Sequence, residues 1–532
     1  MSSGQYLWWQ SGTIYQIYPR SFKDSNADGI GDLAGIIEKL DYLEWLGVDC
    51  IWLSPFYPSP MADFGYDVAD YVNVDPIFGD LAAFDQLVTQ AQTHNIRIIV
   101  DFVPNHSSDE HEWFKESRSS RHNLKRDWYI WRDPLPNGQP PNNWLSNFGG
   151  SAWEFDSTTG QYYLHLFHTK QSDLNWRNPE VRQAMYGALR FWLERGVAGF
   201  RIDVLPLLIK NEQLLDNPLN PDWKEGDHFS HKHHKIHTED QPEIHQIVQE
   251  MRQLAEEYPE KVLIGETYLP YPKLVTYYGQ KLDEAHLPFN FELAMIPEWQ
   301  ASRVKAIVDA YEATLPEGAW PNWVLGNHDQ PRIATRVGQA HARLAQMLLL
   351  TLRGTPTMYY ADELGMENVP IPPELARDPE EVGSPGFGRD PERTPMQWDD
   401  SPNAGFCPPE AIPWLPIASN YQQLNMSAEQ KDGSSILNLV HSLLELRRAT
   451  PALNIGDYHP VNEIPSTCFA FLREFEGQRL LVALNFSDQP QPLILPALGR
   501  GTVLLSTLLD RNEEVDLTSL NLRPTEGLIL RL

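Results

Sequence analysis

The feature that most constrains this chain is a regular alternation of short apolar runs with helix-like stretches. Most of the runs are apolar almost throughout, as expected for parallel strands that are covered on both faces. Eight of them occur, at residues 13–19, 48–54, 96–102, 199–204, 261–266, 286–291, 323–327 and 356–361. Eight βα units predict an α/β fold of the (β/α)8 TIM barrel type. A doubly wound open sheet produces a similar alternation and is the structural alternative.

The stretches between the runs repeat apolar residues at helical spacing, which supports the same alternation. After the first run, Leu33, Ile36, Ile37 and Leu40 share one helical face. The helix that follows the third run begins only near Pro179, and its apolar face comprises Val181, Ala184, Met185, Ala188, Leu189, Trp192 and Leu193. A long insertion must therefore precede this helix.

Two breaks in the alternation divide the chain. Residues 103–172 are rich in Trp, Asn, Gly and Pro, and a loop of this length inside a compact domain is usually functional or a small domain itself. From about residue 457, short strands separated by turn residues predict an all-β sandwich domain. We therefore expect a barrel formed by residues 1–102 and 173–456, an inserted subdomain at 103–172, and a C-terminal β domain at 457–532.

The composition limits the partners that this chain can have. Its net charge of −30 repels phosphate backbones, so we expect no nucleic-acid partner, whereas a neutral substrate meets no such repulsion. No apolar run approaches the roughly 20 residues that span a bilayer, and residues 1–10 lack the features of a signal peptide. The three cysteines, Cys50, Cys407 and Cys468, are too scattered for a disulfide framework. These features predict a cytoplasmic protein without a membrane partner, and we expect a monomer or a homodimer.

Four of the eight runs end in polar side chains. In a parallel barrel the C-terminal ends of the strands meet at one rim, where active sites lie. The third run ends in Asp101, Asn105 and His106, the fourth in Arg201 and Asp203, the fifth in Glu266, and the seventh in Asn327, His328 and Asp329. A single acid after a strand is most often a solvated or capping residue. The convergence of several polar residues predicts a functional site at this rim.

Several segments resemble, in their order along the chain, the signature segments of glycoside hydrolase family 13, the α-amylase family. They are DFVPNH at 101–106, SDLNW at 172–176, GFRIDVL at 199–205, IGET at 264–267 and LGNHDQPR at 325–332. Three more segments resemble the bacterial α-glucosidase and oligo-1,6-glucosidase branch: GYD at 65–67, YLPYP at 268–272 and RDPERTPMQWDD at 389–400. The resemblance covers almost the whole chain and implies a barrel enzyme that cleaves α-glucosidic bonds.

The resemblance assigns the chemistry to three acids. Asp203 matches the nucleophile, Glu266 the general acid/base, and Asp329 a third acid that binds the sugar and stabilises the transition state. Cleavage with retention needs one ionised and one protonated carboxyl group, roughly 5–5.5 Å apart. Arg201 lies two residues before Asp203 on the same strand face, so it is expected to keep Asp203 ionised. Glu266 has no basic sequence neighbour, and we expect nearby acids to keep it protonated.

Further matches concern the binding of glucose. His106 and His328 match residues that hydrogen-bond the hydroxyl groups of the reacting sugar. Phe167, in the segment YYLHLFHTK, is a candidate for an apolar pocket wall, although a position in the core is equally compatible with its sequence context.

The resemblance also implies a closed end to the pocket. In the segment DFGYD, Asp63 and Tyr66 match an acid that binds the non-reducing glucose and an aromatic ring that stacks on it. An arginine of the segment RDPERTPM matches the ion-pair partner of this acid, and we favour Arg393 over Arg389. A domain-packing salt bridge is the alternative for Arg393. A closed end admits only the end of a chain, which favours exo-cleavage of short substrates.

The first loop after a strand contains acids and an amide at alternate positions, Asp24, Asn26, Asp28 and Asp32, and the resemblance implies the carbonyl of Ile30 as a further ligand. This spacing resembles the start of a calcium loop, but position twelve is Gly35 rather than the bidentate Glu of an EF-hand. Related α-glucosidases carry Ca²⁺ or Mg²⁺ here, so we expect a structural metal ion and no organic cofactor. A metal-free loop of Asx turns is the alternative.

A His-rich tract at residues 228–237 has a composition that can bind metal. Its spacing implies no fixed ligand geometry, and we interpret it as a solvent-exposed loop.

These observations favour an exo-acting α-glucosidase for short neutral α-glucosides such as maltose, isomalto-oligosaccharides or sucrose, with glucosyl transfer as a side activity. The alternative is a glucosyltransferase or isomerase of the trehalose synthase or sucrose isomerase type, which uses the same covalent intermediate. Val204, directly after the proposed nucleophile, resembles enzymes that accept α-1,6 bonds, but one position does not decide the linkage.

Overall fold

The computed structural model describes residues 6–532, so the first five residues of the predicted barrel segment lie outside the described part. Eight parallel strands form one sheet in the order β11-β10-β9-β3-β2-β1-β13-β12. Each overlaps a predicted run: β1 (Ile14–Ile17), β2 (Cys50–Leu53), β3 (Arg97–Phe102), β9 (Gly199–Ile202), β10 (Val262–Gly265), β11 (Leu287–Pro288), β12 (Asn322–Val324) and β13 (Thr355–Tyr359). The order is cyclic along the sequence, whereas a doubly wound sheet reverses at a switch point. The predicted barrel is confirmed.

The two ends of this order are joined by a side chain. Within residues 6–532 there is no backbone ladder between β11 and β12. The fully buried Asn322 of β12 spans the seam instead, because its Oδ1 accepts the N–H of Asn290 at 3.0 Å and its amide nitrogen donates to the carbonyl of Pro288. The barrel is thus nearly closed.

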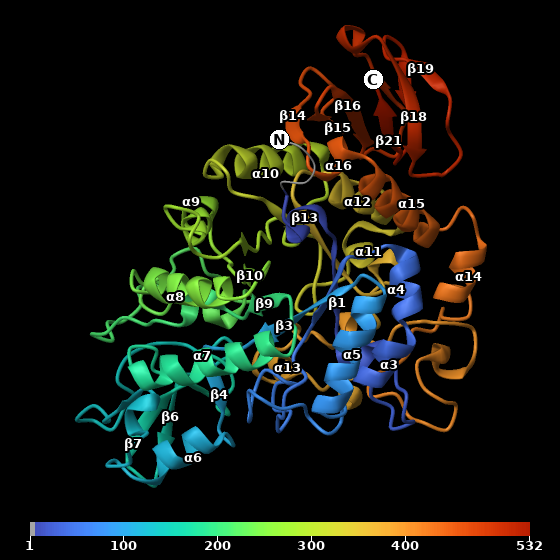
Figure 1. Cartoon of the computed structure of the whole chain (residues 1–532). Coiled ribbons are helices and arrows are strands. Elements are labelled where there is room, and N and C mark those ends of the chain that lie inside the picture. The colour runs from blue at the N-terminus through green and yellow to red at the C-terminus, as the bar shows by residue number, and fades with distance from the viewer. Residues whose placement is uncertain (1–5) are drawn as a thin grey trace.

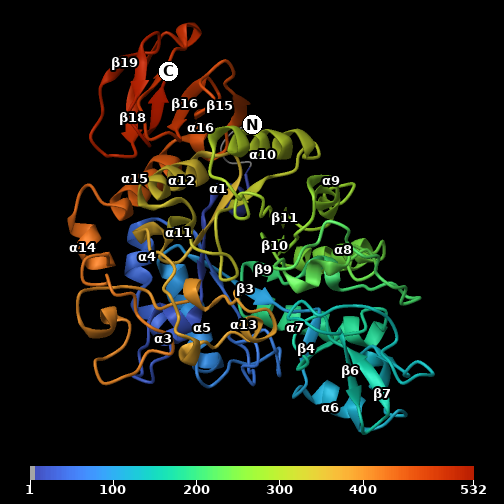
Figure 2. The ribbon, with the colours of Figure 1, turned by 180° about the vertical axis from the view of Figure 1, so that it is seen from behind.

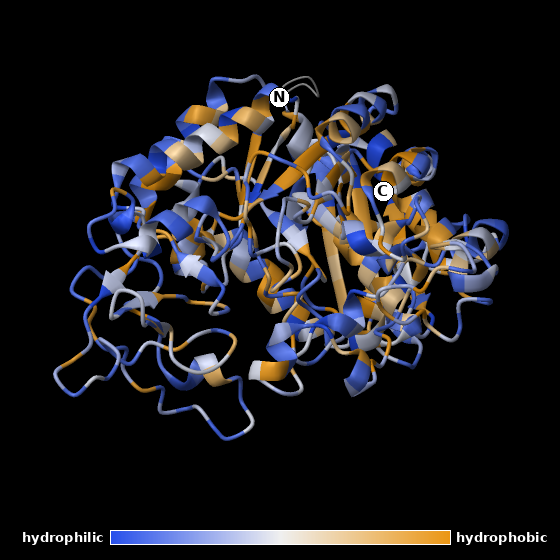
Figure 3. Ribbon diagram, turned by 90° about the horizontal axis from the view of Figure 1, so that it is seen from below, coloured by the Kyte–Doolittle hydropathy of each residue, from blue (hydrophilic) through white to orange (hydrophobic). Residues whose placement is uncertain are grey.

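The strands bury both of their faces. Ile14, Trp52 and Val324 belong to one apolar cluster inside the barrel, whereas Tyr15 and Ile51 belong to the larger cluster beneath the helices. Figure 3 shows the hydrophobic strands at the centre and the hydrophilic loops outside. The main covering helices are α3 (Leu33–Glu38), α4 (Leu40–Leu46), α5 (Leu81–Thr93), α7 (Pro179–Glu194), α8 (Ile244–Glu256), α10 (Ala301–Thr314), α12 (Gln339–Thr351) and α15 (Ile436–Ala449).

Shorter helices fill the connections: α1 (Trp8–Ser11), α2 (Pro19–Phe22), α9 (Tyr271–Leu274), α11 (Ile333–Val337), α13 (Pro379–Gly383), α14 (Met426–Lys431) and α16 (Pro451–Asn454). In the part of the chain that the structure describes, no helix has both the length and the apolar character that a membrane span requires.

The chain between β3 and α7 forms the predicted insertion, which projects from one side of the barrel (Figure 1). Its helix α6 (Glu112–Ser119) accompanies two small antiparallel sheets, β5 (Trp131–Arg132) with β7 (Gln161–Leu164) and β6 (Trp153–Asp156), and β4 (His106–Ser108) with β8 (Gln171–Asp173). Helix α7 begins where expected, because Asn178 accepts the Glu180 N–H and Pro179 occupies the first turn. The exact limits, residues 103–172, stay a prediction.

The C-terminal part is the expected antiparallel β domain. A six-stranded sheet contains β14 (Asp457–Pro460), β15 (Cys468–Phe475), β16 (Gln478–Asn485), β21 (Gly527–Arg531), β18 (Arg500–Ser506) and β19 (Glu514–Asp516). A second pair, β17 (Gln491–Leu493) and β20 (Leu520–Leu522), contributes Leu493 and Leu522 to the same buried cluster as Leu481 and Leu530. Figure 2 shows this domain beside α10, α12 and α15, at the end of the molecule away from the insertion.

The seam generates a test of barrel closure. Replacing Asn322 by Ala leaves a buried N–H and a buried carbonyl without partners, which costs about 1–3 kcal/mol for each group. We expect a lower urea midpoint for Asn322→Ala, whereas the exposed Asn512→Ala should unfold like the parent protein. Equal midpoints for both variants would show that the seam does not depend on this side chain.

Candidate active site

A pocket of about 810 Å³ opens at the C-terminal ends of the barrel strands. Eight of the ten residues predicted for catalysis and sugar binding line it: Asp63, Tyr66, His106, Phe167, Asp203, Glu266, His328 and Asp329. Arg201 and Arg393 lie behind the lining carboxylates and contact them. For Phe167, the pocket-wall position is the one observed, since its ring stands 5.2 Å from that of His106.

Arg201 joins three buried carboxylates from adjacent strands. Its Nη1 lies 2.8 Å from Asp101 Oδ1 and 2.7 Å from Asp203 Oδ1, and its Nη2 lies 2.8 Å from Glu266 Oε2. All four side chains are buried. Sequence analysis predicted the proximity of Arg201 to Asp203 but not its contact with Glu266, which strand β10 brings to the other guanidinium nitrogen.

The three buried acids share one cation, and this affects how readily each of them binds a proton. Burial raises the pKa of Asp203 and of Glu266, and the Arg201 guanidinium opposes this rise in both. Burial likewise raises the pKa of Asp101 against the effect of Arg201. A single guanidinium cannot fully offset three buried carboxylates, so the cluster binds a proton more readily than isolated carboxylates in water do.

Asp329 occupies the opposite electrostatic environment. Its Oδ1 accepts from Arg393 Nη2 at 2.9 Å and from Arg389 Nη1 at 3.1 Å, and its Oδ2 lies 3.3 Å from His328 Nε2. Burial alone would raise the pKa of Asp329, but His328 and the two arginines outweigh it and hold this pKa below its usual range. Asp329 is therefore ionised at neutral pH.

The prediction that Arg393 pairs with Asp63 is wrong. Arg389 is the partner, with its Nη2 3.0 Å from Asp63 Oδ1, whereas Arg393 binds Asp329 and the carbonyl of His328. A single 3-10 turn, Asp390–Glu392, separates the two arginines and brings both to the site. Sequence spacing alone could not distinguish them for this reason.

Two histidines stand on either side of Tyr66. The rings of Tyr66 and His328 stack with an interplanar angle of 1°, and the hydroxyl of Tyr66 lies 2.6 Å from His328 Nε2. His106 Nε2 lies 3.1 Å from the carbonyl of Tyr66 and 3.1 Å from the side-chain amide of Gln171, which also donates to Asp63 Oδ2 at 2.9 Å. Burial lowers the pKa of His106 to about 4, so its ring is neutral at pH 7.

Backbone strain positions Glu266. Val204 has φ +38°, which a β-branched residue rarely adopts. This conformation directs its N–H to Glu266 Oε2 at 2.7 Å. Glu266 Oε2 therefore accepts from Val204 and lies 2.8 Å from Arg201 Nη2, whereas Oε1 makes neither contact. Strain of this kind persists where the surrounding structure imposes it, commonly at functional sites.

The interpretation of the His-rich tract as a solvent-exposed loop is only partly right. His234 is exposed, but His228, His231 and Lys235 line the pocket. The connection after β9 folds back over the barrel end, which composition alone could not reveal. Sequence analysis also missed other lining residues: Asn147, Phe148, Gln171, Glu239, Tyr268, Glu380 and Glu392.

The Asp-rich loop curls through successive Asx turns. Asp24, Asn26 and Asp28 each accept, through Oδ1, the N–H two residues ahead, at 2.9, 3.0 and 2.8 Å. Asp24 and Asp32 are buried, yet the neighbouring Lys23 donates to the carbonyls of Gly405 and Phe406 instead. The oxygens of Asp24 and Asp32 accept backbone and Ser25 donors in this structure. Their oxygen-rich spacing fits a hard cation such as Ca²⁺.

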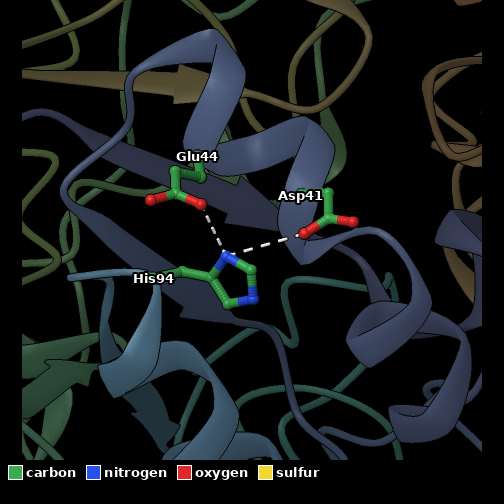
Figure 4. A group of neighbouring side chains, drawn as sticks. All are labelled: Asp41, Glu44 and His94. Carbon is green, nitrogen blue, oxygen red and sulfur yellow. Dashed lines mark hydrogen bonds and ion pairs between the residues drawn. The ribbon is translucent and has the colours of Figure 1, made fainter.

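A second group of potential ligands lies elsewhere on the surface. Within residues 6–532, Asp41 and Glu44 of α4 and His94 at the end of α5 form a compact group (Figure 4). His94 Nδ1 lies 2.7 Å from Glu44 and 3.8 Å from Asp41, whose side chain is 95% exposed. We interpret it as a surface ion-pair group, because hydrated charges of this kind need no metal.

Comparisons with known proteins agree with this geometry. Residues 16–456 match the alpha amylase catalytic domain, so the chain belongs to the α-amylase family, glycoside hydrolase family 13. It is 40% identical to a probable alpha-glucosidase of Rhizobium meliloti (94% of each chain) and 37% identical to an oligo-1,6-glucosidase of Parageobacillus thermoglucosidasius (99% of each). Among solved structures, an alpha-glucosyl transfer enzyme matches with a TM-score of 0.93 at 41% identity, covering 99% of this chain and 100% of that one. A trehalulose synthase variant matches with a TM-score of 0.92 at 36% identity and the same coverage.

The charge cluster around Arg201 predicts a pH-dependent loss of stability. In Arg201→Met, three buried acids lack their cation, and breaking such a group costs about 3–5 kcal/mol. The pKa of each acid is raised in the folded protein, so stability is present at low pH and lost as pH rises through the folded pKa. We expect Arg201→Met to differ little from the parent at pH 4–5 and most at pH 8.

Urea midpoints measured across this range test the expectation. Arg500→Met is the control, because Arg500 pairs with Glu514 at the surface, where both side chains are more than half exposed. A deficit in Arg201→Met that stays constant with pH would contradict the shared-cation account.

Proposed function

We propose that the protein is a retaining, exo-acting α-glucosidase that releases α-glucose from the non-reducing end of short α-glucosides. The observation that carries this proposal is the shared contact of Asp203 and Glu266 with Arg201 inside one pocket. It supplies two carboxyl groups on the same wall, one of which can keep a proton. Relatives at 37–40% identity are named oligo-1,6-glucosidase, maltase and α-glucosidase.

The contacts of each carboxyl group suggest how the first step proceeds. Asp203 Oδ1 is held by Arg201, so Oδ2 is the oxygen that attacks the anomeric carbon. Glu266 Oε2 accepts from Val204 and faces the Arg201 guanidinium, so the proton of Glu266 resides on Oε1, from which it passes to the glycosidic oxygen as the aglycone leaves. The product of this step is a covalent glucosyl ester on Asp203.

The second step reverses these roles. Glu266, now ionised, takes a proton from a water molecule, which attacks the anomeric carbon and releases Asp203. Two inversions give net retention. The ionised Asp329, held by Arg389 and Arg393, is placed to bind sugar hydroxyls without forming a bond to carbon.

Exo-action follows from the wall beside Asp63. The Asp63–Arg389 ion pair joins the segment after β2 to the segment after β13, and Arg389 lies 5.2 Å from the ring of Phe148. We propose that this pair binds the terminal glucose and prevents the substrate chain from extending beyond it. His106, His328 and Tyr66 complete the sugar contacts in the same proposal.

Glucosyl transfer or sugar isomerisation is the competing function. Its support is the likeness to structures named alpha-glucosyl transfer enzyme and trehalulose synthase. Both functions share the glucosyl ester on Asp203 and differ in whether water or a sugar captures it. Transfer is expected as a side activity of the hydrolase.

A panel of maltose, isomaltose, sucrose and trehalose, followed by proton NMR, tests the proposal. We expect α-glucose as the first-formed product and Asp203→Asn to lower kcat by roughly 10⁴-fold or more while the protein stays folded. Initial β-glucose would exclude retention. Isomerised disaccharides as the main products would favour the competing function.

We further propose that the Asp-rich loop binds Ca²⁺ or Mg²⁺ through Asp24, Asn26, Asp28, Asp32 and the carbonyl of Ile30. Such an ion would neutralise the buried carboxylates and fix the loop; it has no part in the chemical steps.

Metal removal tests this site by thermal unfolding. We expect EDTA to lower the apparent Tm of the parent protein and added Ca²⁺ or Mg²⁺ to restore it, because a ligand of the native state stabilises it by mass action. Asp24→Asn should melt lower and no longer respond to EDTA, whereas Asp41→Asn should respond like the parent. A parent Tm that EDTA leaves unchanged would refute the metal site.

A cytoplasmic location also stays a proposal. It is supported by three free, buried thiols, Cys50, Cys407 and Cys468, which suit a reducing compartment.

A further inference from the structure

A hydrogen-bonded pair that the proposed chemistry does not use lies in the wall of the pocket. His228, in the connection after β9, places its Nε2 3.0 Å from Glu380 Oε1 in helix α13, which follows β13. Strands β9 and β13 are four places apart in the ring of eight, so they lie on opposite sides of the barrel. The pair, hereafter the cross-barrel bridge, therefore joins two connections that follow opposite strands, and both of its residues line the pocket.

Packing and charge hold the bridge in place. The ring of Phe387 meets that of His228 edge to face at 5.0 Å. The second oxygen of Glu380, Oε2, lies 3.1 Å from Arg389 Nε, which donates its hydrogen bond to Asp378. Arg389 in turn binds Asp63 and Asp329, so the bridge is connected to the ion pairs that line the inner part of the pocket. The side chains of His228 and Glu380 are 14% and 16% exposed, which protects the pair from full solvent screening.

The inserted segment completes the rim around the bridge. Lys235, from the same connection as His228, donates to Asn147 Oδ1 at 2.7 Å. The backbone of α13 touches the insertion, because a Cβ added at Gly383 would lie 1.6 Å from the carbonyl oxygen of Phe148. Three segments that follow β3, β9 and β13 are thus fastened to one another around the pocket.

We infer that the cross-barrel bridge of His228 and Glu380 determines the length of substrate that the enzyme accepts. This inference rests on the proposed function. A pocket of about 810 Å³ holds a small ligand, and the bridge in its wall limits what can extend outward from the cleavage point. A disaccharide fits beneath the bridge, whereas each further sugar unit must pass beside it. Removing the bridge should therefore raise kcat/KM for long chains and change kcat/KM much less for a disaccharide.

The test compares kcat/KM along two series, maltose to maltohexaose and isomaltose to isomaltotetraose. For the parent we expect kcat/KM to fall at least tenfold from the disaccharide to the longest member of the hydrolysed series. In His228→Ala and in Glu380→Gln, the ratio of kcat/KM for the disaccharide to kcat/KM for the longest substrate should be at least fivefold smaller than in the parent. The double variant should show no larger effect than the stronger single one, because both substitutions remove the same pair.

Two further variants separate the bridge from general damage to the loop. His234→Ala, in the exposed part of the same tract, should keep the parent length dependence. His228→Gln can still donate a hydrogen bond to Glu380, so this variant should keep most of the length dependence. It tests the inference even if His228→Ala proves unstable. A parent without length dependence, or a Gln variant that behaves like Ala, would overturn the inference. Absence of glucose release from every substrate would instead refute the proposed function.

Discussion

The site depends on one guanidinium group that is shared by carboxylates from three neighbouring strands. In the sheet, Arg201 of β9 pairs with Asp101 of β3 and with Ile264 of β10. This register places the three residues at the same height in the barrel. Glu266 follows β10 directly and reaches the second nitrogen of Arg201. A shift of one residue in any of these strands would turn a charged group away from the others. The strand register of the barrel therefore also determines which charged groups meet in the active site.

Two electrostatic zones follow from this arrangement. Around Arg201, acids outnumber the cation, and burial raises the pKa of Asp203 and Glu266. Around Asp329, His328 and two arginines face one carboxylate, and its pKa falls. The zones adjoin within one pocket, so a proton and a permanent negative charge can coexist within reach of one sugar ring.

The sequence predicted the barrel well because burial on both faces leaves a strong local signal in each strand. It also predicted which side chains gather at the rim, since strand ends converge in a closed sheet. It failed where the partner of a residue is distant in the chain. Arg389 and Arg393 lie in one short turn, and only the fold decides that Arg389 reaches Asp63. The contact between Arg201 and Glu266 depends on the register of two neighbouring strands, and the pocket position of His228 depends on a connection whose path has no periodic pattern.

The cross-barrel bridge has a consequence for the order of events in a catalytic cycle. In the proposed binding mode the cleaved glucose lies deeper than the bond that is broken, between Asp203 and the Asp63–Arg389 wall. It can leave only after the remainder of the substrate has left, through the same opening. The enzyme therefore cannot slide along a chain and remove successive units in one encounter. Each glucose is then released in a separate binding event, and the released sugar must leave the pocket before the next substrate can bind.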